Sequence, residues 1–181
     1  MRVGSRIGLL SAVCLILALA GREAAADDKQ LRAEHAAATQ YYVDFRARPG
    51  VLLGHTIVVY GRLNARGQPA TAHYAGLYPA DGQAGVVVGS VVPVDASVRA
   101  VHGDFEHPAT SIYRLKLTAS RYYRLKRAIR HAEKYDTYWH ILFSNCNAFA
   151  ARMAEAIDLQ TPPTLMLPDA FVMALRALND S

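Results

Sequence analysis

The chain has 181 residues, of which 52% are apolar and 19% are charged, and this is the composition of an ordinary globular protein. Its formal net charge is +5, but no block of like charges marks a nucleic-acid-binding tail, so we expect no nucleic-acid partner. Neither an internal repeat nor a low-complexity linker divides the sequence, which predicts one domain after any targeting segment.

The first residues have the pattern of a secretory signal. Arg2 and Arg6 precede an uncharged apolar run over 7–20, and alanines at 24–26 form a small-residue cleavage site. The apolar run is shorter than the roughly 20 residues that cross a bilayer as a helix, so a retained membrane anchor is the less favoured alternative. We therefore predict a signal peptide over 1–26, with cleavage before Asp27 or earlier, and a periplasmic or secreted protein.

Export would leave only one of the two cysteines in the mature protein. Cleavage would remove Cys14, which follows Val13 instead of the small residue expected before a lipid-modified cysteine. The predicted mature domain, 27–181, then keeps 17 basic and 14 acidic side chains, a net charge of +3, and Cys146 as its only cysteine. A lone cysteine in an exported protein is buried and inert, bonded between chains, or kept as a reactive thiol.

The remaining pattern predicts an α+β domain. Acidic residues and helical spacing indicate the first helix, and runs rich in β-branched and aromatic residues indicate the strands. In chain order we expect a helix over 27–48, strands over 51–63 and 71–78 joined by a turn at 64–67, short strands with long loops over 79–110, a strand over 111–117, a helix over 121–135, a strand over 138–143, and helices over 146–157 and 168–178.

Cys146 lies where the strand over 138–143 feeds the next helix. Ser144 and Asn145 can cap that helix, which places the thiol in its first turn. At a helix N-terminus the unpaired backbone N–H groups and the helix dipole favour an anion, which predicts a lowered thiol pKa and a place for an oxyanion. The alternative is a small apolar residue in the core.

His55 lies within the predicted strand over 51–63, on the same face as Ile57 and Val59 by the two-residue alternation. A histidine on an apolar strand face is often only a hydrogen-bonded core residue. A cysteine nucleophile, however, needs a base on a rigid neighbouring element, and His55 could supply it.

The order of these motifs resembles a known superfamily. A strand with Gly54-His55-Thr56, a second strand with His73-Tyr74-Ala75-Gly76, and a later strand-to-helix segment, Asn145-Cys146-Asn147-Ala148-Phe149, are similar to the permuted papain-like hydrolases. These include relatives of NlpC-type cell-wall peptidases and of lecithin retinol acyltransferase. The resemblance covers about 51–159 and implies a circularly permuted papain-like fold, in which an antiparallel sheet packs against the cysteine helix. It also implies Cys146 as nucleophile and His55 as base; the helices flanking this region are additions.

His73 is the first candidate for a third catalytic residue that orients the base. A three-residue turn at 65–67 would place His73 opposite Val59, about 13 Å along the strand from His55. If the loop runs on past Pro69, the register can shift and place His73 opposite His55. Lesser alternatives for the polar helper are Asn145 and His140; otherwise His73 lies at the surface.

Metal and cofactor binding are not expected. His102 and His107 flank Asp104 and Glu106, but the spacing matches no strong zinc pattern, and a solvated polar loop explains it better. The sequence therefore predicts an exported thiol hydrolase, either an amidase or peptidase or an acyl hydrolase or transferase. Its substrate would be a peptide, peptidoglycan or an acyl lipid, with peripheral contact to membrane or cell wall. The alternative is a non-catalytic envelope protein on the same scaffold; the oligomeric state is left open.

Overall fold

The computed structural model describes residues 40–50 and 53–180. The predicted signal peptide over 1–26 and the first part of the predicted helix, 27–39, lie outside these described residues. No helix in the described part of the chain combines the length and the apolar character needed to cross a membrane.

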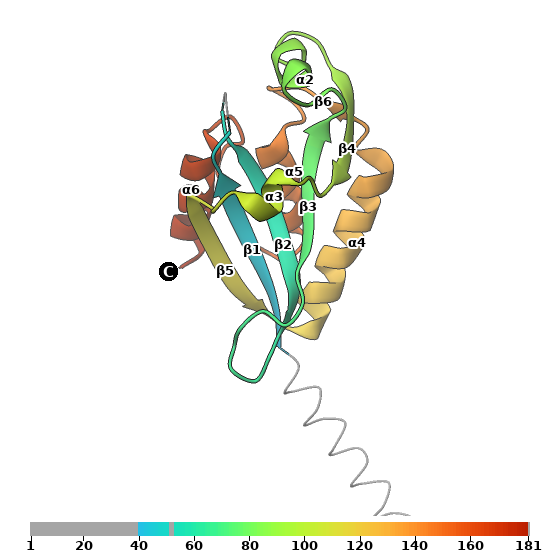
Figure 1. Cartoon of the computed structure of the whole chain (residues 1–181). Helices are drawn as coiled ribbons and strands as arrows, with labels where there is room; N and C mark the ends of the chain where they lie inside the picture. The colour runs from blue at the N-terminus through green and yellow to red at the C-terminus, as the bar shows by residue number, and fades with distance from the viewer. Residues whose placement is uncertain (1–39, 51–52, 181) are drawn as a thin grey trace, which may run out of the picture. The chain divides into compact units, whose positions relative to one another are not determined.

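An antiparallel sheet of six strands forms the centre of the described part, in the order β5-β1-β2-β3-β4-β6 (Figure 1). The strands are β1 (Gln40–Arg48), β2 (His55–Leu63), β3 (His73–Pro79), β4 (Val94–Arg99), β5 (Ser111–Leu117) and β6 (Tyr138–Trp139).

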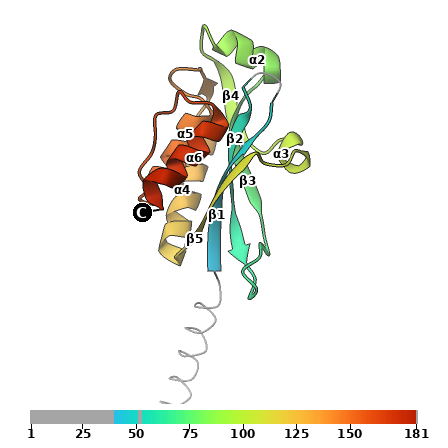
Figure 2. The same ribbon diagram turned by 90° about the vertical axis from the view of Figure 1, so that its left-hand side faces the viewer.

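Three helices cover one face of this sheet and a short one lies on the other face, as Figure 2 shows for α4, α5 and α6 against α3. The α+β class and the packing of helices on an antiparallel sheet are thereby confirmed. The helices are α2 (Gly82–Gly89), α3 (Gly103–Glu106), α4 (Ala119–Tyr135), α5 (Cys146–Glu155) and α6 (Pro168–Asn179).

The sheet separates two groups of buried side chains. The larger group joins the sheet to α4, α5 and α6 and includes the fully buried Phe45, Leu125 and Phe149. The smaller group lies on the other face, where Tyr42, Ile57, Val59, Leu63 and Tyr78 pack together. Because side chains alternate along β2, Val58 points toward the helices while its neighbours point away from them.

The first predicted helix is wrong over 40–48, where the chain forms β1. This strand lies between β2 and β5, so its residues are buried on both faces and lack the polar-apolar alternation of a half-exposed strand. The apolar stretch at 86–88 is part of α2 and not of a strand. The strand predicted over 138–143 ends at Trp139, and the chain turns at 140–144.

The elements that carry the candidate site agree with the sequence pattern. The β2–β3 hairpin forms, with the Asn64 N–H donating to the Gln68 carbonyl across its turn at 2.8 Å. At the start of α5, the Asn145 side chain accepts a hydrogen bond from the Ala148 N–H at 2.8 Å, which is the predicted helix cap. Thr118 caps α4 in the same way.

Candidate active site

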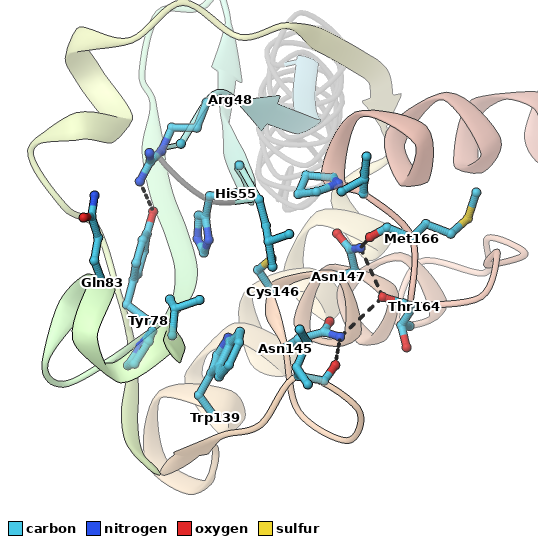
Figure 3. A pocket seen from close by; sticks show the side chains of 18 of the residues that line it. Arg48, His55, Tyr78, Gln83, Trp139, Asn145, Cys146, Asn147, Thr164 and Met166 are labelled. Carbon is cyan, nitrogen blue, oxygen red and sulfur yellow. Dashed lines mark hydrogen bonds between the residues drawn. The ribbon is translucent and has the colours of Figure 1, made fainter. Parts of the chain in front are cut away.

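One cavity of about 620 Å³ brings together segments from both halves of the domain (Figure 3). The start of β2 and the end of β3 form one side, and the first residues of α5 with the segment over 164–168 form the other. Cys146 and His55, the two predicted catalytic residues, both line it. Much of the remaining lining is apolar and includes Leu53, Val86, Trp139, Ile141, Leu142 and Met166.

Cys146 is the first residue of α5, and its side chain is partly exposed to the cavity. Burial of the sulfur raises the pKa of the Cys146 thiol, while hydrogen bonding from the backbone N–H groups of Thr56, Asn147 and Cys146 lowers it only in part. The predicted lowering of this pKa is therefore wrong in direction. The apolar surroundings outweigh the helix N-terminus, so the resting thiol is neutral at pH 7.

The two asparagines beside the cysteine hold the site together. The Asn147 side chain accepts a hydrogen bond from the Thr56 hydroxyl at 2.6 Å and donates to the Thr164 and Met166 carbonyls at 3.1 and 2.7 Å. Asn145 caps α5 and donates to the Ile141 and Thr164 carbonyls. These bonds tie the start of α5 to β2 and to the segment over 161–167, which we name the strap.

His55 is the first residue of β2, and its ring stacks on the Tyr78 ring with centroids 4.1 Å apart. Burial lowers the pKa of His55 to about 3, and the positive charges of Arg48 and Arg99 lower it further in the same direction. The imidazole is therefore neutral at pH 7, and in these surroundings it is a weaker base than an exposed histidine. In Figure 3 the ring lies between Tyr78 and the Cys146 side chain.

Nothing in the described part of the chain orients the His55 ring through its Nε2 atom. This atom is buried and has no hydrogen-bond partner among residues 40–50 and 53–180. Gly76 lies beside it on β3, and a methyl group there would come within 2.9 Å of Nε2. Gly76, which has no side chain, therefore lies where a third catalytic residue would have to bind the His55 Nε2 atom.

His73 does not reach this place. It pairs with Tyr60, five positions along β2 from His55, and its side chain is exposed. The predicted shift that would place His73 opposite His55 is therefore wrong. The loop does not run on past Pro69, which bridges to Leu63 directly after the turn. Instead the Ala70 and Thr71 N–H groups both donate to the Arg62 carbonyl, and this moves the pairing one residue from the Val59 register.

The two alternative helpers have other partners. Asn145 uses its side-chain oxygen and its nitrogen in the helix cap and the strap. His140 accepts a hydrogen bond from the Leu142 N–H at 3.2 Å and stacks on Phe143, so it shapes the turn before α5. Neither residue therefore takes the role that was predicted for His73, since neither binds the His55 Nε2 atom.

Sequence reasoning missed a polar cluster beside His55. The Asp104 carboxylate is fully buried and accepts hydrogen bonds from the Arg48 Nε at 2.8 Å, from the Tyr78 hydroxyl and from the Val101 N–H at 2.9 Å. The segment expected to be a solvated loop is thus anchored at Asp104, while the exposed His102 Nε2 and Glu106 Oε1 atoms lie 2.8 Å apart. No local pattern marks this cluster, because its members come from β1, β3 and α3.

Metal ligands do not gather at the site: within the described ranges, no three His, Cys, Asp or Glu side chains are placed to hold an ion. Comparison of the chain with protein-family models, with curated proteins and with solved structures finds no match. The geometry of the cavity is therefore the basis for any proposal about function.

Proposed function

We propose that this chain is an exported thiol-dependent hydrolase or acyltransferase of the permuted papain-like type, with Cys146 as nucleophile and His55 as base. One observation carries the proposal. The first residue of α5 and the first residue of β2 bring a thiol and a neutral imidazole to the same cavity. The order of the histidine strand and the cysteine helix along the chain supports the permuted arrangement.

The proposed chemistry begins from a neutral pair. As the Cys146 sulfur attacks a carbonyl carbon, His55 takes the thiol proton and later gives it to the leaving group. Backbone N–H groups at the start of α5, which already face the sulfur, stabilise the negative charge on the carbonyl oxygen. Water or another acceptor then takes the acyl group from the thioester, and the free thiol returns.

The apolar lining favours a substrate with an apolar group beside the bond that is cleaved. An acyl lipid has such a group, and a cell-wall peptide fits the predicted export. We propose these two classes as substrates, reached by peripheral contact with the membrane or the cell wall.

A second candidate function is ligand binding without catalysis, as an envelope protein. The observation that favours it is the His55 Nε2 atom, which no described residue orients, together with the raised pKa of the Cys146 thiol. In this case the cavity would bind an apolar ligand and the thiol would be a lining group.

Alkylation of Cys146 by iodoacetamide at pH 7 separates the two candidates. If His55 is the base, His55→Ala slows alkylation about tenfold or more, because the neutral thiol then has no proton acceptor. His73→Ala is the control and leaves the rate unchanged, since His73 lies away from the cavity. Equal rates in the wild-type protein and in His55→Ala would contradict the catalytic proposal.

Product analysis then identifies the substrate class. The wild-type protein and Cys146→Ala are incubated with peptidoglycan fragments and, separately, with phospholipid vesicles, and the products are separated by mass spectrometry. We expect new products from one of the two substrates with the wild-type protein only. Products that form equally with Cys146→Ala would show that the thiol is not the nucleophile.

A further inference from the structure

Arg99 is the last residue of β4, and its partly exposed side chain lines the cavity near His55, on a different wall from Cys146. Its Nη1 atom donates to the Tyr78 carbonyl at 3.2 Å and to Ser97, and its Nη2 atom donates to the Pro79 carbonyl at 3.0 Å. The guanidinium also lies over the Tyr78 ring, 5.4 Å from its centroid. These contacts hold the cation in place against β3.

None of these contacts neutralises the charge of Arg99. All its acceptors are carbonyl or hydroxyl oxygens, and no carboxylate in the described ranges forms a salt bridge with it. Asp104, the buried carboxylate of the neighbouring cluster, is already bound by Arg48, by the Tyr78 hydroxyl and by a backbone N–H group. The wall therefore carries one uncompensated positive charge.

The donors of Arg99 are also incompletely used. A guanidinium has five N–H groups. The contacts above occupy the two on Nη1 and one on Nη2, which leaves the Nε–H and one Nη2–H without a protein acceptor among the described residues. Carboxylate and phosphate oxygens are the acceptors that arginine binds most strongly.

We propose that Arg99 forms an anion-binding subsite in this cavity, which holds a carboxylate or phosphate group of the same molecule that presents its acyl carbon to Cys146. The proposal rests on the proposed function only for the identity of the reacting carbon. The apolar lining and the cation together select an acyl compound with a negative charge a short distance from the reacting group. A peptide carboxylate and a lipid phosphate both satisfy this requirement.

Two alkylating agents that differ only in charge test the subsite without any need for hydrolysis. Iodoacetylglycine carries a carboxylate, and iodoacetylglycinamide carries a neutral amide of nearly the same size. The rate of Cys146 alkylation by each is measured by mass spectrometry at low salt, for the wild-type protein and for Arg99→Gln, Arg99→Lys and the control Arg66→Gln. Arg66 lies in the turn of the β2–β3 hairpin and does not line the cavity.

We expect the wild-type protein and Arg66→Gln to react about tenfold faster with the acid than with the amide, because a charge-assisted hydrogen bond concentrates the acid at the site. Arg99→Gln loses this preference, and Arg99→Lys keeps part of it. The ratio of the acid rate to the amide rate is compared within each variant, because the Arg99 charge also lowers the pKa of His55 and its removal changes the rate with both reagents. Circular dichroism checks that each variant is folded. Equal rates with acid and amide in the wild-type protein, or a preference that survives in Arg99→Gln, would overturn the proposal.

Two competition experiments distinguish a carboxylate from a phosphate as the anion that Arg99 binds. Acetylglycine supplies a carboxylate and glycerol phosphate supplies a phosphate, and each is added during alkylation of the wild-type protein by the neutral amide. The stronger inhibitor identifies the preferred anion, and inhibition should weaken in Arg99→Gln. A result in which His55→Ala leaves alkylation unchanged but the acid preference persists would refute the catalytic proposal and keep the anion subsite.

Discussion

Gly76 determines how much room the His55 ring has. A methyl group at this position would lie 2.9 Å from the His55 Nε2 atom and 2.8 Å from the Tyr78 ring, both closer than packed atoms normally approach. The two stacked rings would have to move apart or away from β3. A small change at one residue of β3 therefore acts directly on the proposed base.

We predict that Gly76→Ala slows the alkylation of Cys146 by iodoacetamide several-fold, because the displaced ring no longer faces the thiol. Overpacking at this site also lowers the free energy of unfolding by about 1–3 kcal/mol. Gly103→Ala is the matched control, since a methyl group there has its nearest neighbour at 3.4 Å, an ordinary contact. An unchanged alkylation rate in Gly76→Ala would mean that the position of the ring does not matter to the thiol.

At the scale of elements, the strap over 161–167 closes one side of the cavity through a few polar bonds. Asn147 contributes two of these bonds, to the Thr164 and Met166 carbonyls, and its side-chain oxygen accepts a third hydrogen bond from Thr56 on β2. Asn147 itself is almost fully buried, so removal of its side chain leaves buried polar atoms without partners.

We predict that Asn147→Ala frees the strap while α5 and the sheet stay folded. The free energy of unfolding should fall by about 2–3 kcal/mol, because buried hydrogen bonds are lost. Hydrogen exchange measured by mass spectrometry should become faster over 161–167. Asn179→Ala removes an asparagine that bonds to the Gln160 carbonyl at the other end of this region, and it should leave the strap protected. Equal exchange in the two variants would contradict the role of Asn147.

The sequence predicts those parts of the site that depend on residues close together in the chain, and it fails for parts that depend on residues far apart in the chain. The sequence predicts the positions of Asn145 and Cys146 correctly because a helix cap is a local pattern. The position of His73 could not be predicted, since a bulge at Ala70 and Thr71 shifts the strand by one residue. The roles of Arg99 and of the buried Asp104 cluster could not be predicted either, because their partners lie on strands far apart in the sequence.

Whole helices and strands also differ in how well local sequence patterns predict them. The helices over 119–135 and 168–179 have one exposed face, and their apolar spacing predicts them well. By contrast, β1 over 40–48 is buried on both faces and has no such periodicity, so the sequence wrongly predicts a helix there. In α2, the valines at 86–88 favour a strand, and packing of Val86 against the large core overrides that preference.

At the scale of the whole molecule, His55 links folding to pH. Its pKa is about 3 in the folded protein, and the ordinary value in an unfolded chain is 6.5. Between these values unfolding takes up a proton, so stability falls as the pH is lowered from 6.5 toward 3. The contribution of neutral His55 is fully present above pH 6.5.

We predict that the wild-type protein loses more stability between pH 7.5 and 4.5 than His55→Gln does, by about 1 kcal/mol, since the ring is partly exposed to the cavity. Urea unfolding at the two pH values measures this difference. His131→Gln removes an exposed histidine of α4 and should keep the wild-type dependence. Parallel pH curves for the wild-type protein and His55→Gln would show that His55 does not take up this proton.

The order of strands also affects how copies of the molecule meet. The sheet ends at β5 on one side and at β6, only two residues long, on the other. Lys116 on β5 is exposed, and Arg114 on the same strand binds the Asp44 carboxylate of β1. Charged side chains on an edge strand hinder pairing with a strand of another molecule. In a concentrated solution, a strand of another copy that approaches β5 would meet these charges first, which disfavours edge-to-edge association through the described sheet.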